Sequence, residues 1–190
     1  RCGKLLYNPQ HFTFVCEIQP VAGLDLERRR SLPGGLVHEV DEVGFELLVG
    51  GVLAADERSV AAECLALHRR PTPPLAAGPA AAAAGASAMI DLSDGLARDA
   101  HRVARASGIA LVLDPAAVAV HADHVAQAVG RSAARRCVLT GGEEHSLLAA
   151  FPPDAQIPPP FAVVGEVVAG HGVRLGDVDL PDAGWDHFAP

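Results

Sequence analysis

The pattern of apolar and polar residues becomes regular after residue 59 of this 190-residue chain. Residues 59–70 begin with Ser59, carry Glu63 near the first turn and end on basic residues, which is the capping and charge pattern of a helix. A proline-rich stretch then stops this helix. The alanine-rich residues 75–84, followed by Gly85, predict a second, short helix.

The next part of the chain predicts a strand, a turn and a helix in direct succession. Residues 87–91 form a short apolar run typical of a buried strand. Ser93 or Asp94 is placed to cap a helix that runs to about residue 107 and stops at Gly108. Apolar positions recur on one face of this helix, at Leu96, Ala100, Val103 and Ala104.

The remainder of the chain consists mostly of short apolar runs separated by turn residues. A helix is expected over about residues 116–129. Strands are expected over residues 109–113, 137–140, 146–151, 161–168 and 173–175. The second and third of these flank a Gly-Gly turn, and the last two are expected to pair as a hairpin.

These elements favour an α+β domain of three layers, α/β/α, built on a mixed sheet, because the strands and helices do not alternate strictly. The N-terminal part gives no strong periodic signal, although residues 12–18 and 43–52 have the composition of strands. We therefore divide the chain into an irregular N-terminal segment, residues 1–57, and a domain over residues 58–190.

Composition narrows the choice of partners. With 49% hydrophobic and 20% charged residues the chain is globular, and with 4% aromatics its core must be built from Ala, Val and Leu. The formal net charge of −8 argues against nucleic acid or an anionic membrane as a partner. A phosphate-bearing substrate would need a divalent cation or backbone N–H groups to bring it in.

Cysteine usage and the start of the chain bear on its location. Cys2, Cys16, Cys64 and Cys137 form no CxxC pair, so neither a zinc site nor a disulfide framework is indicated. The sequence shows no signal peptide and no apolar run long enough to span a bilayer, and we expect a cytoplasmic protein. Because it begins with Arg1 rather than Met, we expect a fragment or a processed product.

Two carboxylates stand three residues apart where the predicted strand gives way to the helix. Asp91 and Asp94 can converge on one point there, and carboxylate oxygens are the ligands that Mg²⁺ prefers. Ser93 adds a hydroxyl, and the helix N-terminus adds N–H groups for a phosphate. The same residues also fit a simpler reading, in which Ser93 or Asp94 caps the helix and Asp91 is a surface group.

Two further positions can carry chemistry. Gly141 and Gly142 allow a close backbone approach, and Glu143 would project from the loop that follows, although an ordinary hairpin turn fits equally well. Trp185 is the one tryptophan of the chain, and its ring can either stack on a flat heterocycle or fill the core. No GxxxxGK[ST] or GxGxxG loop is present, so any ATP chemistry would need another architecture.

Three motifs in the same order resemble thiamine-monophosphate kinases, which share a superfamily with aminoimidazole ribonucleotide synthetase and selenophosphate synthetase. The family's Ile-Asp-x-Ser-Asp-Gly-Leu run matches residues 90–96 in full. Its Gly-Gly-Glu-Asp-Tyr-Glu-Leu run is matched at residues 141–147, and its Asp-His-Phe run at 186–188. The proline-rich lead-in at 68–74 is also similar, so the resemblance extends from about residue 66 to the end.

The resemblance implies a fold like the C-terminal domain of the aminoimidazole ribonucleotide synthetase-like proteins. It also implies roles for particular residues: Asp91 and Asp94 would bind Mg²⁺, Ser93 would contact ATP, and Glu143 and Trp185 would contact thiamine monophosphate. The implied reaction is phosphorylation of thiamine monophosphate by ATP to thiamine diphosphate. Such transfer depends mainly on alignment and on neutralisation of charge by the metal.

Two departures from the family pattern define the alternatives. Glu144, His145 and Ser146 replace the Asp-Tyr-Glu of the second motif. The family's N-terminal domain, which supplies further metal-binding aspartates, part of the ATP site and the dimer interface, has no counterpart in residues 1–57. A truncated kinase, a non-catalytic domain that keeps the fold, and a sister enzyme with another substrate all remain open, and a family-type homodimer would lack its interface domain.

Overall fold

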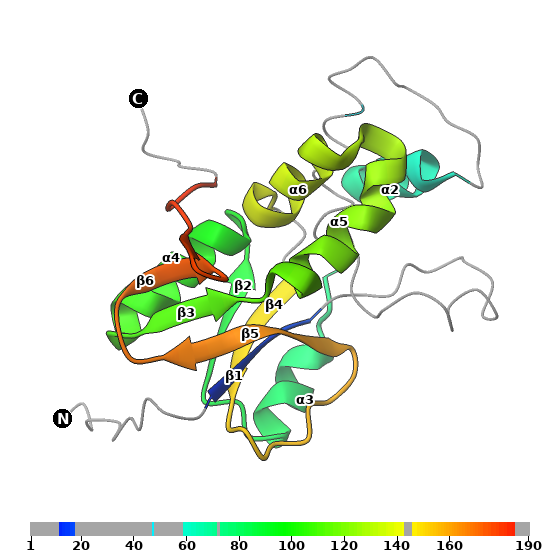
Figure 1. Ribbon diagram of the computed structural model, residues 1–190. Coiled ribbons are helices and arrows are strands. Elements are labelled where there is room, and N and C mark those ends of the chain that lie inside the picture. The colour runs from blue at the N-terminus through cyan, green and yellow to red at the C-terminus, as the bar shows by residue number, and fades with distance from the viewer. Residues whose placement is uncertain (1–11, 18–46, 48–58, 72, 143–145, 185–190) are drawn as a thin grey trace.

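The computed structural model describes residues 12–17, 47, 59–71, 73–142 and 146–184, and its centre is a mixed sheet (Figure 1). In the described residues seven strands are hydrogen-bonded in the order β2-β4-β1-β5-β3-β6-β7. Neighbouring strands are antiparallel, except that β3 and β6 are parallel. The strands are β1 (Phe12–Glu17), β2 (Ala88–Leu92), β3 (Ala110–Leu113), β4 (Ser146–Phe151), β5 (Phe161–Val168), β6 (Gly172–Leu175) and β7 (Val178–Asp179).

Strand β1 comes from the N-terminal part of the chain, yet it lies in the middle of the sheet. It pairs with β4 on one side and with β5 on the other (Figure 1). The strand expected over residues 12–18 is therefore confirmed, and part of the segment 1–57 belongs to the sheet. The second strand expected there, over residues 43–52, lies outside the described residues, apart from Leu47, which is helical and buried. The domain boundary after residue 57 stays a prediction.

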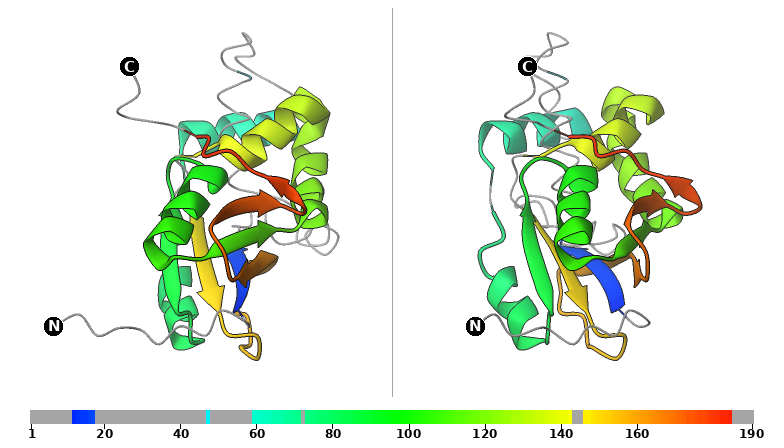
Figure 2. Two further views of the ribbon diagram at one scale, coloured as in Figure 1. Left: turned by 60° about the vertical axis from the view of Figure 1, so that its left-hand side comes forward. Right: turned by 90° about the vertical axis from the view of Figure 1, so that its left-hand side faces the viewer.

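Helices cover both faces of the sheet, which gives three layers. They are α2 (Val60–Arg69), α3 (Ala77–Ala83), α4 (Leu96–Ser107), α5 (Pro115–Val129) and α6 (Arg131–Thr140). The larger core joins α2, α4, α5 and α6 to one face, whereas a smaller core joins α3 to the other. Figure 2 shows α3 and α4 on opposite sides of β2 and β4. The predicted α+β class with a mixed sheet is confirmed.

Strand β4 shows how one sequence serves both cores. Leu148 and Ala150 enter the larger core, while Ala149 and Phe151 enter the smaller one, as the alternation of side chains along a strand requires. Phe151 is fully buried, and its ring meets that of Phe161 edge to face with 5.9 Å between centroids. Both faces of this strand are therefore covered, which explains its nearly continuous apolar sequence.

The helix caps follow the expected local chemistry at two positions. The Ser59 side chain accepts a hydrogen bond of 3.1 Å from the Ala62 N–H and so caps α2. The Asp114 side chain accepts one of 2.8 Å from the Ala116 N–H, with Pro115 as the first residue of α5. The helices expected over residues 59–70 and 116–129 are confirmed with nearly the same bounds.

Three local expectations are wrong. The strand expected at 137–140 is the end of helix α6, because Ala134, Cys137 and Val138 are buried at helical spacing, and a short apolar run alone cannot tell helix from strand. The strand at 87–91 exists as β2 but is mostly exposed, because among the described strands it lies at the edge of the sheet and pairs only with β4. The expected hairpin is absent from the described sheet, because β3 lies between β5 and β6.

Among the described residues no helix is both long and apolar enough to cross a bilayer.

Candidate functional site

The loop between β2 and α4 carries the first motif. Strand β2 ends at Leu92, and Gly95 precedes α4 with a φ of 110°, a conformation that favours glycine. No side chain caps the helix at this position, so the expected cap by Ser93 or Asp94 is wrong. The loop turns through glycine instead, which leaves both side chains available for other contacts.

Asp99, which lies in the first turn of α4, binds the backbone of this loop. Its side chain is fully buried, and its Oδ2 accepts hydrogen bonds of 3.1 Å from the backbone N–H groups of both Ser93 and Asp94. These two N–H groups are therefore already satisfied. The binding of a phosphate by the N–H groups at the start of α4 stays a prediction. The arrangement resembles a capping box, in which an acid in the first turn reaches back to preceding N–H groups.

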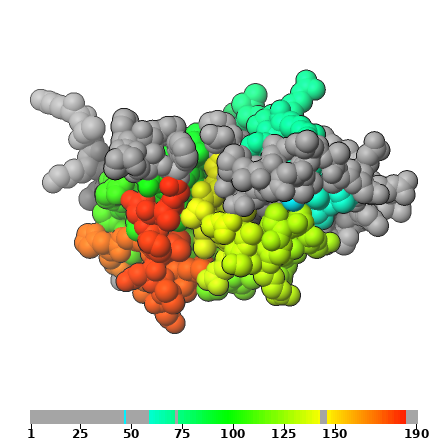
Figure 3. Space-filling view, turned by 90° about the horizontal axis from the view of Figure 1, so that it is seen from above, coloured from blue at the N-terminus to red at the C-terminus, as the bar shows by residue number. Residues whose placement is uncertain are grey.

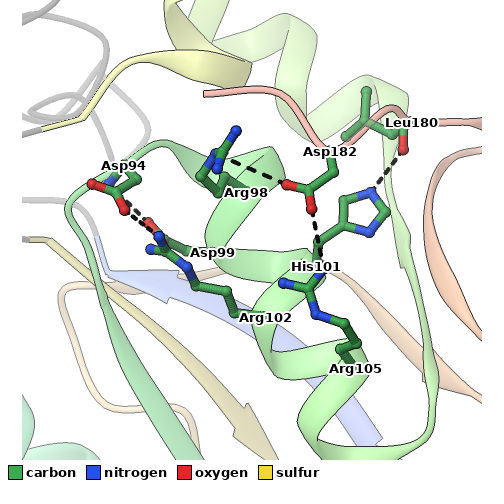
Figure 4. Close-up of polar contacts among 8 residues, drawn as sticks. All are labelled: Asp94, Arg98, Asp99, His101, Arg102, Arg105, Leu180 and Asp182. Carbon is green, nitrogen blue, oxygen red and sulfur yellow. Dashed lines mark hydrogen bonds and ion pairs between the residues drawn. The ribbon is translucent and has the colours of Figure 1, made fainter. Parts of the chain in front are cut away.

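Arg102 lies between two carboxylates. Its Nη1 is 2.5 Å from Asp99 Oδ1, and its Nη2 contacts Asp94 Oδ2 (Figure 4). Burial raises the pKa of Asp99, an effect that the hydrogen bonds from Asp94 and Arg102 reduce without cancelling. Burial lowers the pKa of Arg102, but its bonds to Asp94 and Asp99 outweigh this and raise it, so the guanidinium stays charged.

Glycines bring two distant segments into backbone contact with this loop. A Cβ on Gly142 would lie 2.3 Å from the carbonyl oxygen of Ser93, and one on Gly184 only 2.1 Å from that of Asp94. A Cβ on Gly95 would lie 2.7 Å from the carbonyl oxygen of Thr140. The β2–α4 loop, the end of α6 and the C-terminal segment therefore meet at one junction that only glycine admits at these positions.

Polar contacts also hold the C-terminal segment against α4. His101 Nε2 donates a hydrogen bond of 2.8 Å to the carbonyl oxygen of Leu180. The carboxylate of Asp182 lies 3.2 Å from Arg105 Nη1 and 3.9 Å from Arg98 Nε (Figure 4). Helix α4 thus contacts both the loop before it and the segment that leads to Gly184, which fixes the two relative to each other.

The structure places some of the predicted site residues and is silent on others. Asp91 is exposed in β2, opposite Leu147 of β4, whereas Asp94 is buried in the loop beside the half-buried Ser93. Glu143 and Trp185 lie outside the described residues. The residues directly before them, Gly142 and Gly184, touch the loop that holds Ser93 and Asp94.

Asp99 and Arg102 belong to this site although the sequence did not single them out. The available signal was weak: an acid in the first turn of a helix is common because it favours the helix dipole. What distinguishes Asp99 is that it lies five residues after Asp94, within reach of the N–H groups of the motif loop.

The donor set for a metal is incomplete in the part of the chain that the structure describes. No group of three or more His, Cys, Asp or Glu side chains there could hold an ion. Asp91 and Asp94 offer carboxylate oxygens, and Mg²⁺ commonly takes one or two carboxylates together with waters and substrate phosphates. Their chemistry suits such a partial site, and their role as metal ligands stays a prediction.

An open groove of about 630 Å³ adjoins the junction. It runs between α6, the first turn of α4 and the C-terminal segment; Figure 3 shows that segment in red beside the yellow-green helices. Its lining residues are Ala97, Arg131, Ser132, Arg135, Arg136, Leu139, Thr140, Leu180, Pro181 and Ala183. A small ligand could enter here next to the motif loop.

The fold and the motif loop define an α+β domain with a mixed sheet and a strand–loop–helix site. The family model described as AIR synthase related protein, C-terminal domain, matches residues 46–178. The chain belongs to this family.

Several curated relatives carry one name. The thiamine-monophosphate kinase of Mycobacterium tuberculosis is 40% identical over 132 residues, which covers 67% of this chain and 39% of the relative. The thiamine-monophosphate kinase of Salmonella typhimurium is 31% identical over 186 residues, covering 88% of this chain and 57% of the relative. The chain therefore spans between about two fifths and three fifths of the length of these relatives.

Solved structures share the fold. A structure described as AaThiL complexed with AMPPCP and TMP superposes with a TM-score of 0.71 at 21% identity, covering 94% of this chain and 52% of that one. Thiamine monophosphate kinase from Aquifex aeolicus gives a TM-score of 0.68 at 20% identity, covering 90% and 51%. At such identities the likeness shows the fold alone.

Proposed function

We propose that this chain is the metal- and nucleotide-binding part of an enzyme that phosphorylates thiamine monophosphate with ATP, giving thiamine diphosphate and ADP. The observation that carries the proposal is the junction at the β2–α4 loop. It joins the loop of Ser93 and Asp94, which follows Asp91 of β2, to Gly142 of the second motif and to Gly184, two residues before the third motif. The names of the relatives and the complex of AaThiL with AMPPCP and TMP support the choice of substrates.

The resemblance to the thiamine-monophosphate kinases gives each motif residue a role in this reaction. A phosphate oxygen of thiamine monophosphate bonds to the γ-phosphorus of ATP while the bond from that phosphorus to the β-bridging oxygen breaks, and ADP leaves with the electron pair. Asp91 and Asp94 would hold Mg²⁺, which neutralises charge on the phosphate oxygens. The Ser93 hydroxyl would contact ATP, and Glu143 and Trp185 would contact thiamine monophosphate. A cytoplasmic location is part of this proposal, and the absence of a CxxC pair from the sequence is consistent with it.

The test uses the single tryptophan of the chain as its reporter. With Mg²⁺ and ATP present, thiamine monophosphate is expected to change the emission of Trp185, whereas adenosine monophosphate should not. Asp91→Asn should weaken this response. An emission that does not respond to saturating thiamine monophosphate in folded protein would contradict the substrate assignment.

A glycine pair supplies the matched control for the junction. Gly184→Ala should abolish the emission change, because its Cβ would meet the Asp94 carbonyl oxygen at 2.1 Å and its φ of 149° disfavours alanine. Gly85→Ala has a comparable positive φ of 90° but open space around it, so it should bind normally. Equal binding by both variants would show that the junction has no role in the site.

Release of ADP by the same chain is the second measurement. Turnover that is lost in Asp91→Asn would assign catalysis to this chain. Binding without ADP release would restrict the proposal to a binding part of a larger enzyme, and the absence of both would favour a non-catalytic domain.

A further inference from the structure

The Asp94–Arg102–Asp99 cluster is built more tightly than a surface ion pair. Asp99 is completely buried, with a relative solvent exposure of 0%, and Asp94 is 6% exposed. The side chain of Arg102 is partly open to solvent, with a relative exposure of 38%. Two carboxylates thus share one guanidinium, which leaves the three side chains with one negative charge in excess. A buried carboxylate without a cation nearby is strongly disfavoured, so Arg102 stabilises both acids.

The two carboxylates that contact Arg102 differ in what else they bind. Asp99 is committed to the loop, since its second oxygen holds the N–H groups of Ser93 and Asp94. Asp94 contacts the guanidinium of Arg102 through Oδ2, and this carboxylate is the one proposed to bind Mg²⁺. A guanidinium and a divalent cation would compete for the oxygens of Asp94, whereas Asp99 can keep Arg102 in either case.

We propose that Asp99 is a positioning residue that fixes the Ser93–Asp94 loop, and that Arg102 is an internal counter-ion which a divalent cation displaces from Asp94. The inference rests on the proposed role of Asp94 as a metal ligand. Arg102 keeps the buried acid neutralised before the metal arrives and remains anchored on Asp99 afterwards. Arg102 therefore weakens metal binding, whereas Asp99 strengthens it.

The experiment is a calorimetric titration of the whole 190-residue chain with Mg²⁺ and with Mn²⁺, without nucleotide, at low salt. Arg102→Gln should tighten binding about three- to tenfold, which is the range that the net contribution of one ordinary hydrogen bond gives. Asp99→Asn should weaken it about tenfold, because the loop loses its charged acceptor. Opposite changes in metal affinity in the two variants are decisive, since simple damage to the fold would weaken binding in both.

Arg70→Gln is the matched control, because it removes the same charge from an exposed position at the end of α2. It should change the affinity less than twofold, which separates local displacement from a change in net charge. Circular dichroism checks the fold of each variant. If Asp99→Asn does not fold, the sign for Arg102→Gln alone decides.

The outcomes separate this inference from the proposed function. Wild-type chain that binds neither ion overturns the metal role of Asp91 and Asp94 and, with it, this inference. Wild type that binds metal, with Arg102→Gln equal or weaker, overturns the counter-ion and leaves the metal role intact. Tighter binding in Arg102→Gln, with Arg70→Gln unchanged, supports the displacement.

Discussion

The carboxyl group of Asp99 connects the shape of the motif loop with its charge. Asp91, Ser93 and Asp94 could be selected from the sequence because they stand together in one short motif. Asp99 and Arg102 could not, since acids and bases along a helix are usually solvated and only the packing of α4 against the loop turns these two inward. Glu143 and Trp185 stay predictions, because they lie outside the described residues.

The raised pKa of Asp99 gives a pH signature at the residue scale. Its folded form holds a proton at pH values where the unfolded chain has released it. The contribution of Asp99 to stability is therefore complete below the ordinary pKa of an aspartate and is lost as pH rises through the raised value. The free energy of unfolding of wild type minus that of Asp99→Asn should therefore fall as the pH rises above the ordinary pKa of an aspartate.

Urea unfolding at several pH values measures this difference. All other titrating groups are common to the two proteins and largely cancel. A difference that is constant or that grows with pH would show that burial of Asp99 does not dominate its ionisation.

At the scale of elements, the local sequence predicted the helices more reliably than it predicted which strands pair with each other. Ser59 and Asp114 mark the starts of α2 and α5 because capping is decided within a few residues. The identity of α6 was missed because its apolar residues form one short run after several arginines. The pairing of β6 with β3 was also missed, since no local pattern shows that the chain passes β3 before it forms the next strand.

The thin layer formed by α3 depends on few side chains, and Phe151 is the largest of them that is fully buried. Phe151→Ala should lower the free energy of unfolding by about 3–5 kcal/mol through lost burial and a residual cavity. Leu75→Ala, in the turn before α3, removes a side chain that is 85% exposed and should change it by less than about 0.5 kcal/mol. Chemical denaturation compares the two, and equal effects would contradict a packed layer on this face.

At the scale of the whole molecule, the class of fold could be predicted but its order of strands could not. A mixed α+β architecture follows from the succession of helical and extended segments. The central place of β1 depends on pairing with residues more than a hundred positions away, about which the composition of residues 12–17 carries no information.

Deletion of the N-terminal part tests this topology. A chain that begins at residue 59 lacks β1, so β4 and β5 lose the strand between them. It should show no cooperative unfolding transition, whereas a chain that begins at residue 12 should retain one. Thermal unfolding followed by circular dichroism distinguishes them, and a cooperative transition in the shorter chain would show that β1 is dispensable.

The position of β1 also bears on how the molecule is made. Its residues are synthesised before the strands on either side of it, Ser146–Phe151 and Phe161–Val168, and more than a hundred residues separate it from them. The middle of the sheet therefore cannot close until most of the chain has emerged, and contacts of such long sequence separation form slowly. A nascent chain must keep β1 unpaired while the residues between β1 and β4 are made, which makes the newborn protein a client for chaperones.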